Sequence, residues 1–145
     1  RKAGKNKVKY NVDRMPGTAV FQRGFERLHD FENWRVMTSG VERQERPTVL
    51  QKHDLTDEVF IVLSGGGFML LGDTPDRLEA CPMEAGKSYV VPRGVWHSHV
   101  LAGGTQLLIV ENNDTGEHNS PLATMTREQI EAYGALIEAG TACKE

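Results

Sequence analysis

Short runs of apolar and β-branched residues recur through the middle of the chain, and turns rich in glycine and proline separate them. The clearest run is 58–63, in which side-chain alternation places Glu58, Phe60 and Val62 on one face. About eight such runs with tight turns favour an all-β sandwich or barrel over a parallel sheet with crossover helices. The expected strands are 18–22, 34–38, 49–52, 58–63, 68–71, 78–83, 87–91, 97–101 and 106–111.

The turns and the C-terminal pattern add detail to this prediction. The glycine-rich segment 64–67 predicts a hairpin between strands 58–63 and 68–71, and Pro82 predicts an edge position for strand 78–83. After Pro121 the spacing of apolar residues changes from the alternation of strands to the period of a helix. Thr126 and Gln129 have the spacing of a capping box, and they are followed by apolar residues at helical spacing, Ile130, Tyr133 and Ile137. One short C-terminal helix is expected.

The length of 145 residues suits a single domain with one core. We predict three parts: an extended N-terminal arm (1–33), the barrel (34–120) and a C-terminal helical segment (121–145). The arm is polar and mixed in charge, which is typical of a loosely held segment.

Composition narrows the range of partners. The net charge of −3 and the pI near 6.0 provide no basic face for nucleic acid, and the basic residues near the N-terminus have the character of a solvated tail. No apolar run approaches the roughly 18 residues of a membrane span. Two cysteines, Cys81 and Cys143, are too few for a disulfide framework. We therefore expect a cytoplasmic protein that contacts neither membranes nor nucleic acid.

Candidate chemistry begins with Glu58, a carboxylate at the start of a strand that is apolar on both faces. A buried carboxylate needs a cation or a charged partner to offset its desolvation. His97 and His99 are two residues apart, so they share a face if their segment is a strand. With His53, these residues supply the types found in 2-His-1-carboxylate sites for a divalent ion such as Fe, Mn, Ni or Zn.

Two sequence motifs resemble those of the cupin superfamily. The second family motif is matched by Gly86, Pro92, Gly94 and His97, although Leu101 replaces the asparagine that usually closes it. The first family motif is matched by His53, Glu58 and Gly65, with Gln51 where another histidine belongs. The two motifs span residues 51–97, about a third of the chain.

The resemblance implies a small single-domain cupin, folded as a double-stranded β-helix or jelly-roll barrel around one divalent metal ion. The implied ligands are His53, Glu58 and His97. Gln51 is either a weak amide-oxygen ligand or a hydrogen-bonding partner that stops His53 from rotating. His99 is a fourth ligand, a hydrogen-bonding neighbour of the ligands or a general base, and we favour one of the last two roles.

Aromatic residues on the strands are candidates for the wall of a substrate pocket, although such residues more often fill a core. The candidates are Phe60, Tyr89, Trp96 and Trp34. Phe60 is expected to point inward because it lies two residues from Glu58. The polar segment 111–114 suits a turn, and we assign no chemistry to it.

These features favour a metal-dependent enzyme of dioxygenase, isomerase or lyase type that acts on a small oxygen-rich metabolite. The fold alone does not choose among such activities. Two other hypotheses are open: a non-catalytic small-molecule binding or sensor protein, and a metal-free sugar epimerase or isomerase in which His53 and His99 act as acid and base. Family barrels often pair through an outer sheet or an exchanged N-terminal strand, so we expect a homodimer.

Overall fold

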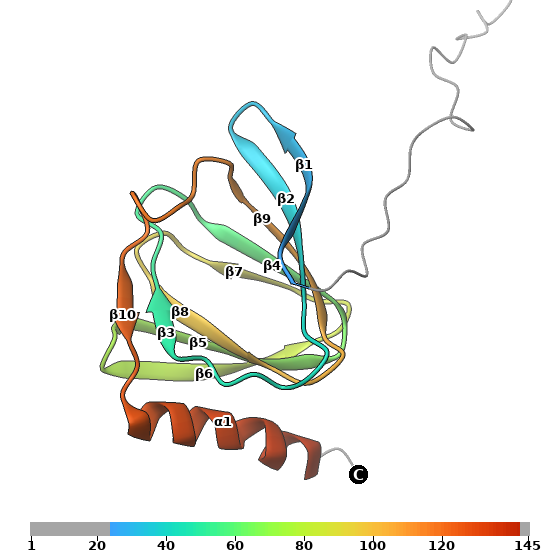
Figure 1. Ribbon diagram of the computed structural model, residues 1–145, viewed down its shortest axis with the longest axis vertical. Helices are drawn as coiled ribbons and strands as arrows, with labels where there is room; N and C mark the ends of the chain where they lie inside the picture. The colour runs from blue at the N-terminus through green and yellow to red at the C-terminus, as the bar shows by residue number, and fades with distance from the viewer. Residues whose placement is uncertain (1–23, 143–145) are drawn as a thin grey trace, which may run out of the picture.

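The computed structural model describes residues 24–142 as two five-stranded antiparallel sheets, packed face to face, with one helix at the C-terminal end (Figure 1). Sheet A has the strand order β1-β2-β9-β4-β7, and sheet B has the order β10-β3-β8-β5-β6. The elements are β1 (Glu26–Phe31), β2 (Trp34–Gly40), β3 (Val49–Gln51), β4 (Glu58–Ser64), β5 (Gly66–Thr74), β6 (Arg77–Glu84), β7 (Ser88–Val91), β8 (Trp96–Leu101), β9 (Gln106–Asn112), β10 (Leu122–Thr124) and α1 (Arg127–Ala142). This architecture confirms the predicted all-β jelly-roll barrel with a C-terminal helix.

The main core lies between the two sheets and follows the predicted alternation. On β4, Glu58, Phe60 and Val62 are buried, whereas Val59 and Ile61 are only partly buried. Phe60 and Val62 face Ile109 and Leu107 on β9, respectively. The buried side chains of this core are Met37, Phe60, Val62, Met69, Met83, Val91, Leu101, Leu107 and Ile109.

Helix α1 lies against sheet B (Figure 1), and a second apolar cluster of side chains packs between them. Leu70 and Val100 on the outer face of the sheet pack with Ile130 and Tyr133 of the helix. The capping box is confirmed. The backbone N–H of Thr126 donates to Gln129 Oε1 at 2.9 Å, and the N–H of Gln129 donates to Thr126 Oγ1 at 3.1 Å. The third predicted apolar position, Ile137, has a side chain outside the described part of the structure.

The predicted hairpin between β4 and β5 is wrong, because these strands belong to different sheets. The glycine segment carries the chain across the barrel. Gly65 has a φ of +78°, and a Cβ there would lie 2.3 Å from Thr105 Oγ1. The Thr105 hydroxyl donates to the carbonyl of Gly66 and accepts from its N–H, each at 3.0 Å. The glycines are therefore needed for close backbone approach at a crossover.

Both terminal segments contribute strands to the sheets. Part of the expected arm forms β1, which pairs with β2 through the two-residue turn of Glu32 and Asn33. Exposed polar side chains dominate β1, which is why its sequence lacks the apolar signature of a strand. At the other end, β10 precedes the helix and pairs with β3. The edge position of the Pro82 strand, β6, is confirmed.

Several predictions fall beyond the described residues or are not tested by them. The strand at 18–22 and Cys143 lie outside 24–142, while Cys81 carries a free thiol. Within the described range, no helix has the length and apolar character needed for a membrane crossing. The cytoplasmic location stays a prediction.

Candidate metal centre

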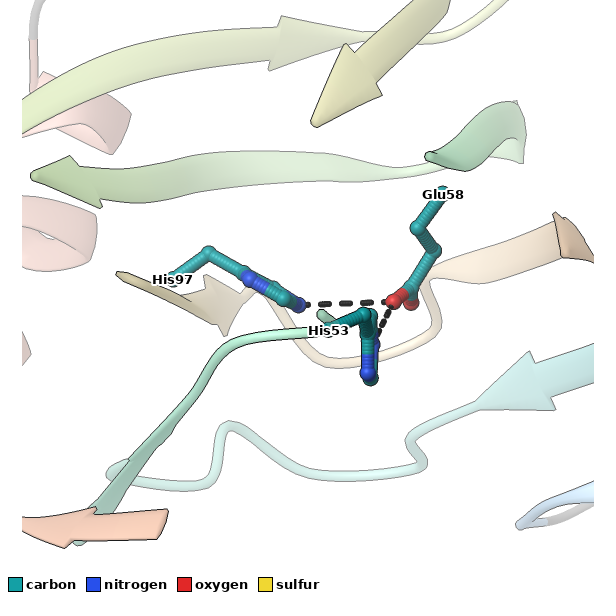
Figure 2. A group of neighbouring side chains, drawn as sticks. All are labelled: His53, Glu58 and His97. Carbon is teal, nitrogen blue, oxygen red and sulfur yellow. Dashed lines mark hydrogen bonds and ion pairs between the residues drawn. The ribbon is translucent and has the colours of Figure 1, made fainter. Parts of the chain in front are cut away.

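Three predicted ligands converge inside one end of the barrel. Glu58 begins β4 in sheet A, His97 is the second residue of β8 in sheet B, and His53 follows β3. Figure 2 shows both imidazoles directed at the Glu58 carboxylate from different sides. One ligand atom from each residue lies within 4.8 Å of the others, and all three residues are buried. The structure therefore brings together the three residues that the sequence predicts as ligands.

The orientation of each imidazole is fixed by a hydrogen bond on its far side. His97 Nδ1 lies 3.0 Å from the carbonyl oxygen of Val95, so it is the protonated nitrogen that donates. His53 Nδ1 lies 2.7 Å from Ser120 Oγ, whose own proton goes to Asn119 Oδ1 at 3.1 Å. Both rings therefore hold Nδ1–H outward and direct Nε2 inward, the arrangement typical of metal-binding histidines.

The Nε2 atoms meet on a single oxygen of the carboxylate. His97 Nε2 is 3.4 Å from Glu58 Oε2, and His53 Nε2 contacts the same oxygen (Figure 2). With their Nε2 protons removed, the two imidazoles and one carboxylate oxygen form a donor set that suits a borderline divalent cation. The residues present therefore fit the metal ion that the cupin resemblance implies.

Backbone contacts tie the two motif regions together. The N–H of Gly94, in the turn before β8, donates to the carbonyl of His53 at 2.7 Å. The N–H of Arg93 donates to Asp57 Oδ1 at 2.8 Å. Gly94 has a φ of +79°, which glycine adopts at little cost. The spacing of glycine and proline in the second motif thus places His97 beside the His53 loop.

Burial and charge act in opposite directions on the cluster. Burial alone would raise the pKa of Glu58, but hydrogen bonds and charge from His53 and His97 lower that pKa to about 2. Burial opposes the charged form of His97, yet the neighbouring Glu58 carboxylate raises the pKa of this imidazole. The carboxylate is therefore ionised throughout the physiological range and available to a cation.

A small cavity adjoins the cluster, with a volume of about 130 Å³. Gln51, Phe60 and His99 line this cavity together with Glu58 and His97. The His99 ring lies 6.0 Å from that of Phe60, and burial lowers the pKa of His99, which favours the neutral imidazole. The predicted shared face of His97 and His99 and the inward direction of Phe60 are confirmed.

The other predicted pocket residues lie elsewhere. Since His97 points into the barrel, Trp96 points out of it and packs in the cluster under α1, with Lys52 Nζ 5.2 Å from its ring centre. Tyr89 packs against the main core and accepts a hydrogen bond from the backbone N–H of Glu84 at 2.8 Å. Trp34 stacks edge-on against Phe31 in the β1–β2 hairpin. Trp96, Tyr89 and Trp34 thus lie outside the lining of the cavity.

Sequence reasoning missed two residues at the centre. Ser120 provides the hydrogen bond to His53 that was considered for Gln51. Glu111, to which we assigned no chemistry, is buried on β9 with Oε2 3.8 Å from His53 Nε2. The alternation of β9 could have revealed Glu111, because Leu107, Ile109 and Glu111 share a face. No comparable signal marks Ser120, which lies in an irregular segment.

A larger cavity of about 740 Å³ lies between the β5–β6 turn and α1. Its lining includes Asp73, Arg77 and Tyr133 and none of the predicted site residues. The small cavity beside the histidines is therefore the candidate site, because its lining includes the convergent donors Glu58 and His97.

Comparisons with known proteins agree with this fold. The family model described as the cupin domain matches residues 41–111. A protein from Bacillus halodurans has the same fold, with a TM-score of 0.59 at 17% identity over 84% of this chain and 97% of that chain. Pac13 of Streptomyces, described as a nucleoside dehydratase, has a TM-score of 0.55 at 19% identity, covering 85% and 96%. KdgF from Halomonas sp. has a TM-score of 0.53 at 13% identity, covering 65% and 81%.

At these identities the structural likeness shows the fold alone. A search of curated proteins found no significant match. The activity therefore has to be argued from the site.

Proposed function

The chain is a member of the cupin superfamily, and on that premise we propose that it is an enzyme with one divalent metal ion held by His53, Glu58 and His97. The orientation of the imidazoles carries the proposal, because each Nδ1 is engaged on its far side and each Nε2 is directed at Glu58. Fe, Mn, Ni and Zn all accept this combination of nitrogen and oxygen donors.

The size of the cavity favours a small substrate. Its volume of about 130 Å³ lies below the roughly 300–1,000 Å³ of pockets for drug-sized ligands. When bound, the ion would supply Lewis-acid polarisation of a substrate oxygen or a coordination position for dioxygen. A small oxygen-rich metabolite, transformed by a dioxygenase, isomerase or lyase reaction, fits both properties.

His99 is the residue to which we assign proton transfer. It lines the cavity beside the metal ligands, and its lowered pKa favours the neutral form that can accept a proton near pH 7. Phe60, 2% exposed, forms the apolar side of the cavity and excludes water from it. Gln51 lines the same cavity and offers an amide to orient a polar group of the substrate.

Metal analysis of protein purified without chelators tests the proposal. We expect about one equivalent of divalent metal in the wild type, its loss in His97→Ala and its retention in His99→Gln. His29→Ala is the matched control, because His29 is exposed on the distant β1 strand. Wild-type protein that stays empty after incubation with Fe, Mn, Ni and Zn would overturn the proposal.

A metal-free acid–base enzyme is the second candidate. The direct contact of His53 with Glu58, beside a neutral His99, resembles the paired groups that such catalysis requires. The fold neighbour Pac13 is described as a nucleoside dehydratase and has been crystallised with uridine. An empty wild-type site would favour this candidate, although the small cavity argues for a ligand smaller than a nucleoside.

We also propose that the chain forms a homodimer through the outer face of sheet A. The strand register places Val36, Val110, Val59 and Val90 in one row across four strands, and Val90 is 55% exposed. Helix α1 covers the corresponding face of sheet B, whereas no helix within residues 24–142 covers this row, so the row offers an apolar surface to a second copy of the chain. Light scattering should give about twice the 16.1 kDa chain mass, and Val90→Glu should halve it. A wild-type monomer at micromolar concentration would contradict the dimer.

A further inference from the structure

Three charged side chains form a row across the inner face of sheet A, next to the metal centre. Arg35 on β2 pairs directly with Glu111 on β9. The register of β9 with β4 pairs Val110 with Val59, so its continuation places Glu111 opposite Glu58. Side chains that face each other across neighbouring strands have Cβ atoms about 4.5–5.5 Å apart. The two carboxylates are therefore neighbours inside the barrel.

Arg35 holds only one oxygen of Glu111. Its Nη2 and Nε donate to Oε1 at 2.7 Å and 3.3 Å, while the guanidinium also donates to the carbonyls of Thr115 and Asn113 at 3.2 Å and 3.4 Å. The second oxygen, Oε2, lies 3.8 Å from His53 Nε2, beyond hydrogen-bonding distance. Glu111 is thus anchored on one side and presents its other oxygen to the cluster.

Negative charge exceeds positive charge in the row of Arg35, Glu111 and Glu58. The row contains two buried carboxylates and one guanidinium, which pairs with Glu111, and the imidazoles are the partners of Glu58. Adjacent buried carboxylates repel each other, and a cation between them would remove that repulsion.

We propose that Glu111 Oε2 supplies a fourth protein donor to the metal ion, in the coordination role that the imidazole missing at Gln51 would otherwise have. This inference depends on the proposed function, since it requires that a divalent ion binds to the cluster. The donor set then contains two imidazoles and two carboxylates and carries two negative charges. Such an anionic set, in which half of the donors are carboxylate oxygens, favours Mn²⁺ and Fe²⁺ over softer ions.

Titration of chelator-treated full-length protein with Mn²⁺, followed by electron paramagnetic resonance, tests this assignment. Glu111→Gln should weaken Mn²⁺ binding at least about tenfold and change the spectrum of the bound ion. Glu79→Gln is the matched control, because Glu79 is an exposed carboxylate on β6. Binding by Glu111→Gln within twofold of the wild type would overturn the inference.

The double variant Arg35→Gln/Glu111→Gln separates ligation from a structural role, because it removes both members of the ion pair. We expect thermal stability to return toward that of the wild type while Mn²⁺ binding stays weak. Recovery of wild-type Mn²⁺ affinity in the double variant would show that Glu111 serves only as the partner of Arg35. A wild type that binds none of Mn, Fe, Ni and Zn would overturn the proposed function itself, whereas unchanged Mn²⁺ binding in Glu111→Gln overturns only this inference.

Discussion

The inside of the barrel has a polar end and an apolar end, and the same three strands build both. Along β4, β8 and β9 the inward side chains change in parallel from charged or imidazole groups to aliphatic ones. The polar end contains Glu58, His97 and Glu111, the middle contains Phe60, His99 and Ile109, and the apolar end contains Val62, Leu101 and Leu107.

Burial has different physical requirements at the two ends. At the apolar end, burial of hydrocarbon stabilises the fold without any requirement for partners. At the polar end, each buried group needs a specific neighbour, such as Ser120 for His53 and Arg35 for Glu111. The contrast predicts that changes at the apolar end act on stability alone, whereas changes at the polar end act on metal affinity and, by leaving a buried group without its partner, on stability as well.

The largest effect on stability is expected from Leu107→Ala at the apolar end. Leu107 is fully buried, so its truncation leaves a cavity and should lower the free energy of unfolding by about 2–5 kcal/mol. Metal affinity of the folded protein should change little. Urea unfolding with a parallel metal titration measures both quantities. A loss of stability under 1 kcal/mol, or a large loss of metal affinity, would contradict the proposed difference between the apolar and polar ends.

A second prediction concerns the pH dependence of stability in metal-free protein. The pKa of Glu58 is about 2 in the fold against an ordinary value of 4.5, so its ionised form stabilises the fold above pH 4.5 and this contribution falls as pH drops toward 2. Between pH 5 and pH 3 the wild type should lose about 2 kcal/mol more than Glu58→Gln. Urea unfolding in the presence of chelator at both pH values measures the difference. Equal losses in the two proteins would show that Glu58 is not stabilised as an anion.

The third prediction addresses the partner of His53. Ser120→Ala removes the acceptor for Nδ1–H and should weaken metal binding about 10–100-fold, as expected for a residue that orients a ligand. Ser88→Ala, at an exposed position on β7, should bind metal like the wild type. Calorimetric titration with Zn²⁺ compares them. Equal affinities in the two variants would mean that Ser120 does not orient His53.

Most of the fold and the convergence of His53, Glu58 and His97 were predictable, because strand alternation and the two cupin-like motifs mark these positions. Alternation along β4 placed Glu58 and Phe60 inside, and Thr126 with Gln129 marked the start of the helix. The sequence did not reveal that the glycine segment crosses between sheets, because glycine permits a hairpin and a crossover equally well. Nor did it identify Trp96 as an outward residue, since the register of β8 had to be known first.

Residues that act through long-range contacts were the hardest to predict. Glu111 is 76 residues from Arg35, and Ser120 is 67 residues from His53. Only the folded sheets bring these pairs together, and no local spacing encodes them. The polar end therefore contains the residues that sequence patterns missed, in keeping with its dependence on specific neighbours.

Anomalous diffraction from crystals grown with a supplied metal, such as Mn²⁺ or Zn²⁺, tests the central claim most directly. The account predicts one peak at the polar end of the barrel, about 2.0–2.3 Å from Nε2 of His53, Nε2 of His97 and a carboxylate oxygen of Glu58. Metal-replete crystals with no peak between these three side chains would contradict it.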